Sequence, residues 1–155
     1  MSTVVKTVTR WVIAFIFVYG IYIVAYGHIS PGGGFAGGVI LACGFVLLVL
    51  AWGRSDALGY FPYAKARVLD SVGALIFLGL ALLGLVSTQG LFFANFIQSS
   101  HPGKALRLFN GGIIPLANIG IALKVCASLF LVMVVFAVLR VSASGDDAGF
   151  QSQEE

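Results

Sequence analysis

Residues 27–52 read GHISPGGGFAGGVILACGFVLLVLAW, a glycine-rich run that opens directly into an apolar segment without Asp, Glu, Lys or Arg. Residues 35–52 approach the length of about 20 apolar residues that a helix needs to cross the hydrocarbon core of a bilayer. Comparable apolar segments lie at about 8–26, 70–87 and 111–139. The sequence therefore predicts an all-α membrane protein with four transmembrane helices, in which the glycine-rich run forms a hairpin between the first and second helices.

The composition supports a chain that is solvated mainly by lipid. Of its 155 residues, 59% are hydrophobic and only 10% are charged, and its mean hydropathy is +1.03. A water-soluble domain carries about 25% charged residues, so a catalytic domain outside the membrane is excluded by both length and composition. The net charge of +3 does not indicate a nucleic-acid partner, because the basic residues form no cluster. We expect residues 1–141 to form one membrane domain.

The basic residues near the segment ends predict the orientation, because cytoplasmic loops carry an excess of Lys and Arg. Four spans place both termini on one side. That side would hold six basic residues, and the other side would hold two: Lys6, Arg10, Arg54, Lys65, Arg67 and Arg140 against Lys104 and Arg107. Both termini are therefore expected in the cytoplasm. Residues 142–155, rich in Ser, Gly, Asp and Glu, are expected to form a disordered acidic tail.

The glycine-rich run has a structural meaning rather than a nucleotide-binding one. Gly32, Gly34 and Gly37 match G-x-G-x-x-G, but that motif binds dinucleotides only between a strand and a helix. Glycines spaced by four, which let helices approach closely, point instead to packing. Two interpretations remain open: a tight hairpin, or irregular backbone that partner subunits cover because lipid cannot satisfy it. The residues that we assign to this structural loop and to helix packing are Pro31, Gly32, Gly33, Gly34, Phe35, Gly37 and Gly38.

Lys124 lies near the middle of the last apolar segment. An ammonium at that depth costs at least about 2.5–3.5 kcal/mol, so it must face a partner group or water. Apart from Asp70, which falls at the edge of the third span, no carboxylate lies in any predicted membrane segment. We therefore expect the counter-group of Lys124 to come from a neighbouring subunit or a hydrated path. Asn118 and His28 join Lys124 as candidates for an ion path or an inter-subunit polar site. Both a structural ion pair and a proton or cation station remain open.

Two further features of the sequence bear on the site. Pro115 is expected to break the last helix, because proline removes a backbone hydrogen bond and clashes with the carbonyl four residues earlier. Cys43 and Cys126 are isolated from each other and from other ligand types, so they indicate neither a metal site nor a disulfide. No catalytic residue, metal or cofactor is predicted.

Two motifs make the chain resemble a known family. Residues 27–38, GHISPGGGFAGG, resemble the G-H-x-x-P-G-G-G-F-x-G-G signature of the MnhB family, which is the B subunit of the multisubunit Mrp (Mnh) Na⁺/H⁺ antiporter. Residues 115–125, PLANIGIALKV, look like that family's N-x-G-x-x-L-K-V element. The resemblance covers about residues 8–140. The residues of this chain that match the family's two motifs include Pro31, Phe35, the glycines, Asn118 and Lys124.

The resemblance implies a non-catalytic accessory subunit of a cation/proton antiporter in a prokaryotic plasma membrane. Its partners would be Mrp subunits of the A, C, D, E, F and G types and the lipid bilayer, with Na⁺ and H⁺ transported by the whole complex. The subunit would support assembly and is a candidate element of the ion pathway. Two alternatives stay open: the equivalent subunit of a membrane-bound hydrogenase or related respiratory complex, and a stand-alone homo-oligomeric transporter or scaffold.

Overall fold

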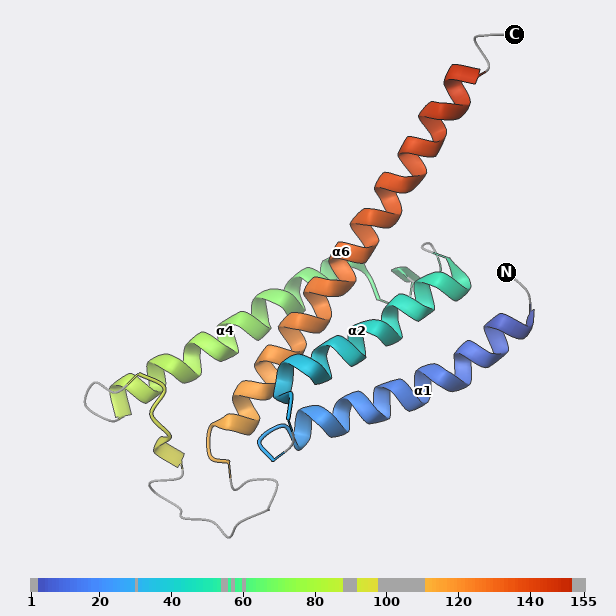
Figure 1. Ribbon diagram of the computed structural model, residues 1–155. Coiled ribbons are helices and arrows are strands. Elements are labelled where there is room, and N and C mark those ends of the chain that lie inside the picture. The colour runs from blue at the N-terminus through green and yellow to red at the C-terminus, as the bar shows by residue number, and fades with distance from the viewer. Residues whose placement is uncertain are drawn as a thin grey trace.

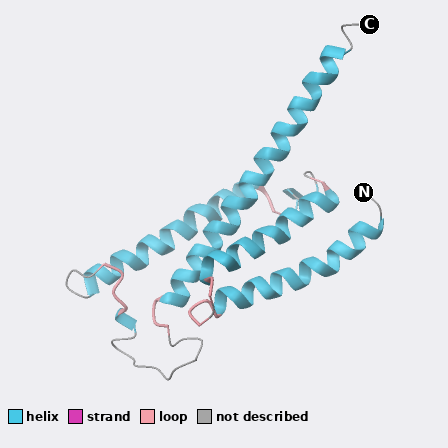
Figure 2. Cartoon of the chain, in the orientation of Figure 1, coloured by secondary structure: helices cyan, strands magenta, loops and turns pink. Residues whose placement is uncertain are grey.

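The computed structural model describes residues 3–29, 31–53, 56, 58–59, 61–87, 92–97 and 111–151, with side chains in the last helix described as far as Phe136. The described residues contain four long helices and no strand: α1 (Thr3–Ala25), α2 (Gly33–Trp52), α4 (Tyr63–Ser87) and α6 (Ile114–Gln151) (Figures 1 and 2). All four are long and apolar enough to cross a membrane, α6 through its part Ile114–Phe136. The prediction of a multi-pass, all-α membrane protein is confirmed.

The helices lie side by side, with α2 and α6 in the middle. α6 packs against both α2 and α4, and α1 packs chiefly against α2 (Figure 1). Successive helices run in alternating directions, so α1 begins and α6 ends at the same end of the molecule. Which end faces the cytoplasm stays a prediction, since Arg54, Lys104 and Arg107 lie outside the described residues.

Glycines allow the helix backbones to approach closely. Lipid tails are as apolar as leucine, so membrane helices associate through packing at small residues rather than through the hydrophobic effect. A Cβ on Gly38 would lie 2.9 Å from the carbonyl oxygen of Ala122, and a Cβ on Gly73 would lie 2.6 Å from that of Gly120. These contacts fix the two seams of α6, against α2 and against α4.

Phenylalanines fill the space where the start of α4 meets α2 and α6. Phe130 is 1% exposed and packs with Val49, Ala66 and Val134. Its ring lies 5.7 Å from that of Phe45 and 5.2 Å from that of Phe61, both edge-on. Such edge-to-face pairs add about 0.5–1.5 kcal/mol each beyond the packing of their area. This cluster holds the helices together at one end of the molecule.

Both ends of α6 differ from the sequence prediction. The helix begins at Ile114 rather than Gly111, because residues 111–113 form a turn. Pro115 therefore lies in the first turn, where its missing N–H costs nothing, and the predicted helix break is wrong. At the other end, α6 continues to Gln151 through most of the predicted disordered tail. That segment contains no proline, and a helix that has begun extends at little cost per residue.

Candidate functional site

Lys124 forms an ion pair within its own chain. Its Nζ lies 2.9 Å from Oδ1 of Asp70 and donates a second hydrogen bond of 3.3 Å to Oγ of Ser128. The Ser128 hydroxyl in turn donates a short hydrogen bond to the same oxygen of Asp70. The expectation that a neighbouring subunit or a hydrated path supplies the counter-group of Lys124 is therefore wrong. We call these three residues the Asp70–Lys124–Ser128 cluster.

Close contact between α4 and α6 positions this cluster. A Cβ on Gly73 would lie 2.7 Å from the backbone nitrogen of Lys124, so the two backbones touch where the side chains of Asp70 and Lys124 meet. Ser128 follows Lys124 by one helical turn and shares its side of α6. The cluster therefore depends on the close contact of α4 and α6 at Gly73. Without that contact, the carboxylate of Asp70 could not reach both Lys124 and Ser128.

The cluster lies within the membrane-spanning part of both helices. Asp70 lies seven positions after the first residue of α4, and Lys124 lies ten positions after the first residue of α6. At a rise of 1.5 Å per residue these separations are about 10 Å and 15 Å, in a hydrocarbon core about 30 Å thick. The side chains nevertheless remain 48% exposed for Lys124 and 32% exposed for Asp70. An ion pair at membrane depth is thus open on one side.

Asn118 belongs to a different polar contact. Its Oδ1 accepts a hydrogen bond of 3.2 Å from the backbone N–H of Gly34. The first N–H groups of a helix have no partner within the helix, so Asn118 on α6 caps α2 from a neighbouring helix. The residue is only 7% exposed, and its Nδ2 is buried without a hydrogen bond to any described residue. Asn118 therefore ties the glycine-rich run to α6.

His28 lies at the ends of the helices and not with Lys124. A Cβ on Gly111 would lie 3.1 Å from Cγ of His28, which places the imidazole against the turn that precedes α6. Asn95 holds the same turn, because its Nδ2 donates to the carbonyl oxygen of Gly111 and its Oδ1 accepts from the N–H of Ile113. The three candidates His28, Asn118 and Lys124 therefore do not form one site.

The remaining predicted residues lie around the start of α2. Gly34, Gly37 and Gly38 are buried, whereas Phe35 is 62% exposed. Gly32 and Gly33 have φ values of +112° and +52°, a conformation that glycine adopts without a steric penalty. Pro31 is exposed in the turn before them. The run thus turns sharply and then places its glycines against α1 and α6.

The prediction for Asn118 concerns stability. Asn118→Ala leaves the N–H of Gly34 buried without an acceptor, which costs about 1–3 kcal/mol. We expect a clear fall in the thermal melting temperature of the purified protein. Thr7→Ala is the control, because the Thr7 hydroxyl is exposed and bonds only to a carbonyl in its own helix; it should melt as the parent does. Equal melting of the two variants would contradict the capping role.

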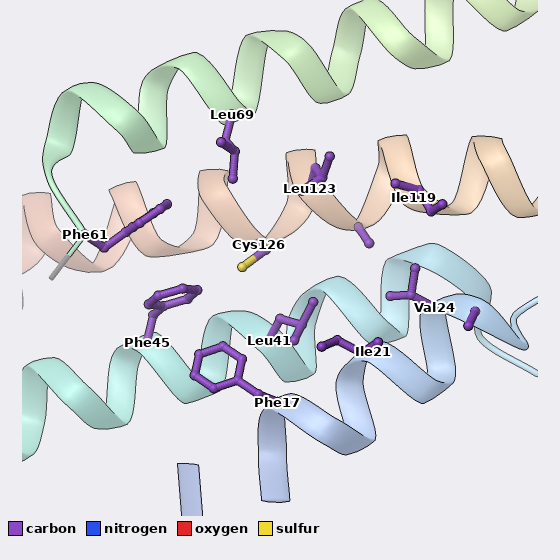
Figure 3. Close-up of a pocket in the computed structure, with 12 residues that line it drawn as sticks. Phe17, Ile21, Val24, Leu41, Phe45, Phe61, Leu69, Ile119, Leu123 and Cys126 are labelled. Carbon is purple, nitrogen blue, oxygen red and sulfur yellow. The ribbon is translucent and has the colours of Figure 1, made fainter. Parts of the chain in front are cut away.

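A separate apolar cavity of about 360 Å³ lies between the helices (Figure 3). Side chains from α1, α2, α4 and α6 point into it, among them Ile21, Leu41, Leu69, Ile119 and Leu123. An ion in this cavity would have no polar partner and would pay the full cost of its lost hydration. The cavity is therefore not a candidate for the ion path.

The contacts of Asp70 and Ser128 with Lys124 were not predicted from the sequence. The third span was expected to begin at residue 70, which placed Asp70 at its edge, but α4 begins at Tyr63. The signal was available: Lys65 and Arg67 carry long basic side chains, which can extend to water from the first turns of a membrane helix. A helix that starts before them carries Asp70 to the depth of Lys124.

Comparison with known proteins gives consistent matches. Residues 4–131 match the family described as "Domain related to MnhB subunit of Na+/H+ antiporter". The chain is 38% identical to the uncharacterized protein MJ1307 of Methanocaldococcus jannaschii over 114 residues, which are 71% of this chain and 42% of that protein. It is 37% identical to mnhB2 of Staphylococcus aureus strain Newman, which carries the name of an antiporter subunit, over 75 residues (48% of this chain and 52% of that protein).

A solved structure shares the fold. A chain in the structure of the membrane-bound sulfane sulfur reductase (MBS), an archaeal respiratory membrane complex, superposes with a TM-score of 0.68 at 29% identity. The match covers 89% of this chain and 58% of that one. The chain spans about half the length of the relatives that it matches. Because the family match extends over most of the sequence, from residue 4 to residue 131, the chain belongs to the MnhB family.

Proposed function

We propose that this protein is a non-catalytic membrane subunit of an Mrp-type cation (Na⁺)/proton antiporter in a prokaryotic plasma membrane. It supports assembly of the complex with the A, C, D, E, F and G type subunits and contributes the Asp70–Lys124–Ser128 cluster to the ion pathway. The observation that carries the proposal is the ion pair at 2.9 Å within the membrane-spanning region. A charged pair is costly at that depth, and ion pathways are a principal reason for such residues to be kept there.

The cluster also explains why one chain is not the whole antiporter. The only carboxylate within the described parts of the four helices up to Phe136 is Asp70, and Lys124 and Ser128 both bind it. A carboxylate held by an ammonium and a hydroxyl is not free to exchange Na⁺ for H⁺ unaided. The sequence places Asp70 at the edge of the third span, whereas the structure places it inside α4, where Lys124 and Ser128 bind its carboxylate.

One observation favours a second candidate function. The structural match is to a respiratory membrane complex that is a sulfane sulfur reductase. The chain would then serve the equivalent antiporter module of a respiratory complex or membrane-bound hydrogenase, where redox chemistry drives ion movement. The local geometry of the cluster is compatible with either assembly, because only the energy source differs.

The composition of the complex separates these functions. The chain, carrying a small affinity tag, is purified from its own membranes in mild detergent, and the proteins that accompany it in stoichiometric amounts are identified. Antiporter subunits alone support the first proposal. Subunits with iron–sulfur clusters or nickel support the second, and a homo-oligomer without other proteins would overturn both in favour of a stand-alone transporter or scaffold.

Transport by the chain alone provides an independent test. Reconstituted by itself in proteoliposomes, the chain is expected to show no Na⁺-dependent proton flux, because Lys124 pairs with Asp70, the carboxylate that the described parts of the helices offer. Flux is measured with a pH-sensitive dye trapped inside the vesicles, and the purified complex serves as the positive control. Na⁺-dependent flux from the single chain at a rate near that of the complex would overturn the proposed role.

Phe35 provides a test of the assembly role. Its side chain is 62% exposed, so the fold of the single chain does not depend on it, while its position beside the glycine-rich run suits contact with a partner subunit. Phe35→Ala is expected to leave the amount of the chain in the membrane unchanged and to reduce the large complex on blue-native gels. A normal complex together with normal transport would show that Phe35 faces lipid.

A further inference from the structure

The Asp70–Lys124–Ser128 cluster occupies a face of the molecule that no described helix covers. Successive residues on a helix are separated by about 100°, which places Ser128 about 180° from Ile119 around α6. Ile119 lines the apolar cavity, so the cluster and the cavity lie on opposite sides of the helix. Ala74, one turn beyond Asp70, is exposed beside the cluster, and Ile121 is partly exposed there. We call these five residues the pair face: Asp70, Ala74, Ile121, Lys124 and Ser128.

The hydrogen-bonding capacity of the pair face is only partly used. An ammonium has three N–H donors, and Lys124 uses two of them, toward Asp70 and Ser128. Both hydrogen bonds to Asp70 end on Oδ1, so Oδ2 accepts none from the described residues. One donor and one acceptor therefore remain, side by side, on a surface that is about half exposed for Lys124 and one third exposed for Asp70.

Lipid cannot satisfy these two groups. Each polar group left without a partner in hydrocarbon costs several kcal/mol, and the cluster lies about 10–15 Å along α4 and α6 from their first residues, inside both candidate membrane spans. The long exposed side chains elsewhere, such as Trp11 and Phe15 on α1 at 68% and 73%, are apolar or aromatic and can meet lipid. The pair face is thus a surface that carries charged groups inside two candidate membrane spans and requires polar cover.

The charge of the pair defines what can cover it. Asp70 and Lys124 sum to zero, so an additional carboxylate or ammonium would leave a net charge buried in a medium of low dielectric constant. A neutral group that both accepts and donates, a hydroxyl or a carboxamide, can bond to the remaining N–H of Lys124 and to Oδ2 of Asp70 at once. The small side chain of Ala74 leaves room for a helix backbone to approach.

We propose that the pair face is a subunit interface, covered by a transmembrane helix of another membrane subunit that contributes a neutral hydroxyl or carboxamide side chain to the pair. This inference rests on the proposed role as one subunit of an assembly and adds which face meets the partner. The partner need not supply a counter-charge, because the chain supplies its own.

The test uses a photo-reactive benzoylphenylalanine placed at position 74 or, separately, at position 121 in the full complex. After irradiation in native membranes the complex is purified, and the cross-linked peptides are identified by mass spectrometry. Both positions are expected to give adducts with one membrane-spanning segment of one stoichiometric subunit, and that segment should contain Ser, Thr, Tyr, Asn or Gln. The same labels in the chain expressed without its partners should give lipid adducts, which serves as the control.

Other outcomes would overturn the inference. Lipid adducts at both positions within an intact complex would show that the pair face is open to the bilayer. No adduct at either position would indicate a water-filled cavity. A cross-linked segment that is wholly apolar, or that brings its own charged residue, would contradict the predicted chemistry. Absence of any co-purifying subunit would instead refute the proposed function, so the two failures are distinguishable.

Discussion

Lys124→Met is expected to cause the largest loss of complex of any single charge removal in this chain. Methionine keeps the length of the side chain but leaves the carboxylate of Asp70 without its ion-pair partner at 2.9 Å. Removing one member of a buried pair costs about 3–5 kcal/mol, and the pair is buried once a partner subunit covers it. The abundance of the assembled complex, measured on blue-native gels, should fall at least tenfold. Lys65→Met, at an exposed position in the first turn of α4, is the matched control and should assemble normally.

The double variant Asp70→Asn/Lys124→Met separates assembly from transport. Because it leaves no charge unpaired, it is expected to restore most of the complex that Lys124→Met loses, and the double-mutant cycle measures the coupling directly. If the cluster is part of the ion pathway, as proposed, the restored complex should still fail to exchange Na⁺ for H⁺. Full exchange by the assembled double variant would reduce the pair to a structural role.

Lys124→Arg completes this series. Arginine keeps the positive charge beside Asp70 but does not release its proton at any physiological pH, and its planar fork has a different shape from an ammonium. The Arg variant is therefore expected to assemble, and to lose exchange if Lys124 passes a proton. Normal exchange by Lys124→Arg would show that the position needs only a fixed positive charge.

The four spans could be predicted from sequence because each is a long apolar segment, whereas the starts of α4 and α6 could not. The start of α4 was displaced to residue 70 because charged residues were assigned to the water phase, although Lys65 and Arg67 lie inside the helix that starts at Tyr63. The start of α6 depends on Asn95, which binds the turn at Gly111 and Ile113 from a distant part of the chain. A contact between two separate stretches of the chain leaves no pattern in the local sequence of either stretch.

Which residues make up the site depends on how each helix is rotated about its own axis. Hydrophobic periodicity alone does not define that rotation. Lys124 was identified as a residue that needs a partner, but the partner follows from which side of α6 meets α4. The Gly73–Gly120 contact sets that side, and it can be recognised only when both helices are placed. The same packing separates Asn118 from Lys124, because Asn118 faces α2 and Gly34. Asn118 and Lys124, six positions apart on α6, thus lie at two different helix contacts, the first with α2 and the second with α4.

Gly34→Leu is expected to abolish assembly even though it changes no charged or polar side chain. A Cβ at position 34 would lie 2.7 Å from Cα of Asn118, a distance that real Cβ atoms essentially never show, and both atoms belong to backbones that cannot move independently. The added side chain would force α2 away from α6 and break the hydrogen bond of 3.2 Å from the Gly34 N–H to Asn118. Even Gly34→Ala should be harmful, because the clash begins at the Cβ atom.

Gly79→Ala provides the matched control for this prediction. Gly79 lies within α4, and a Cβ at that position would meet nothing within 4 Å, so alanine should be tolerated and should favour the helix by about 1 kcal/mol. On blue-native gels, Gly34→Ala and Gly34→Leu are expected to lose the large complex in increasing degree, while Gly79→Ala retains it. The order matters because a general sensitivity to any added methyl group would affect Gly79 as well. If Gly34→Leu assembled and transported normally, the backbone contact between α2 and α6 would not be required, and the glycine-rich run would be only a tolerant connection between two helices.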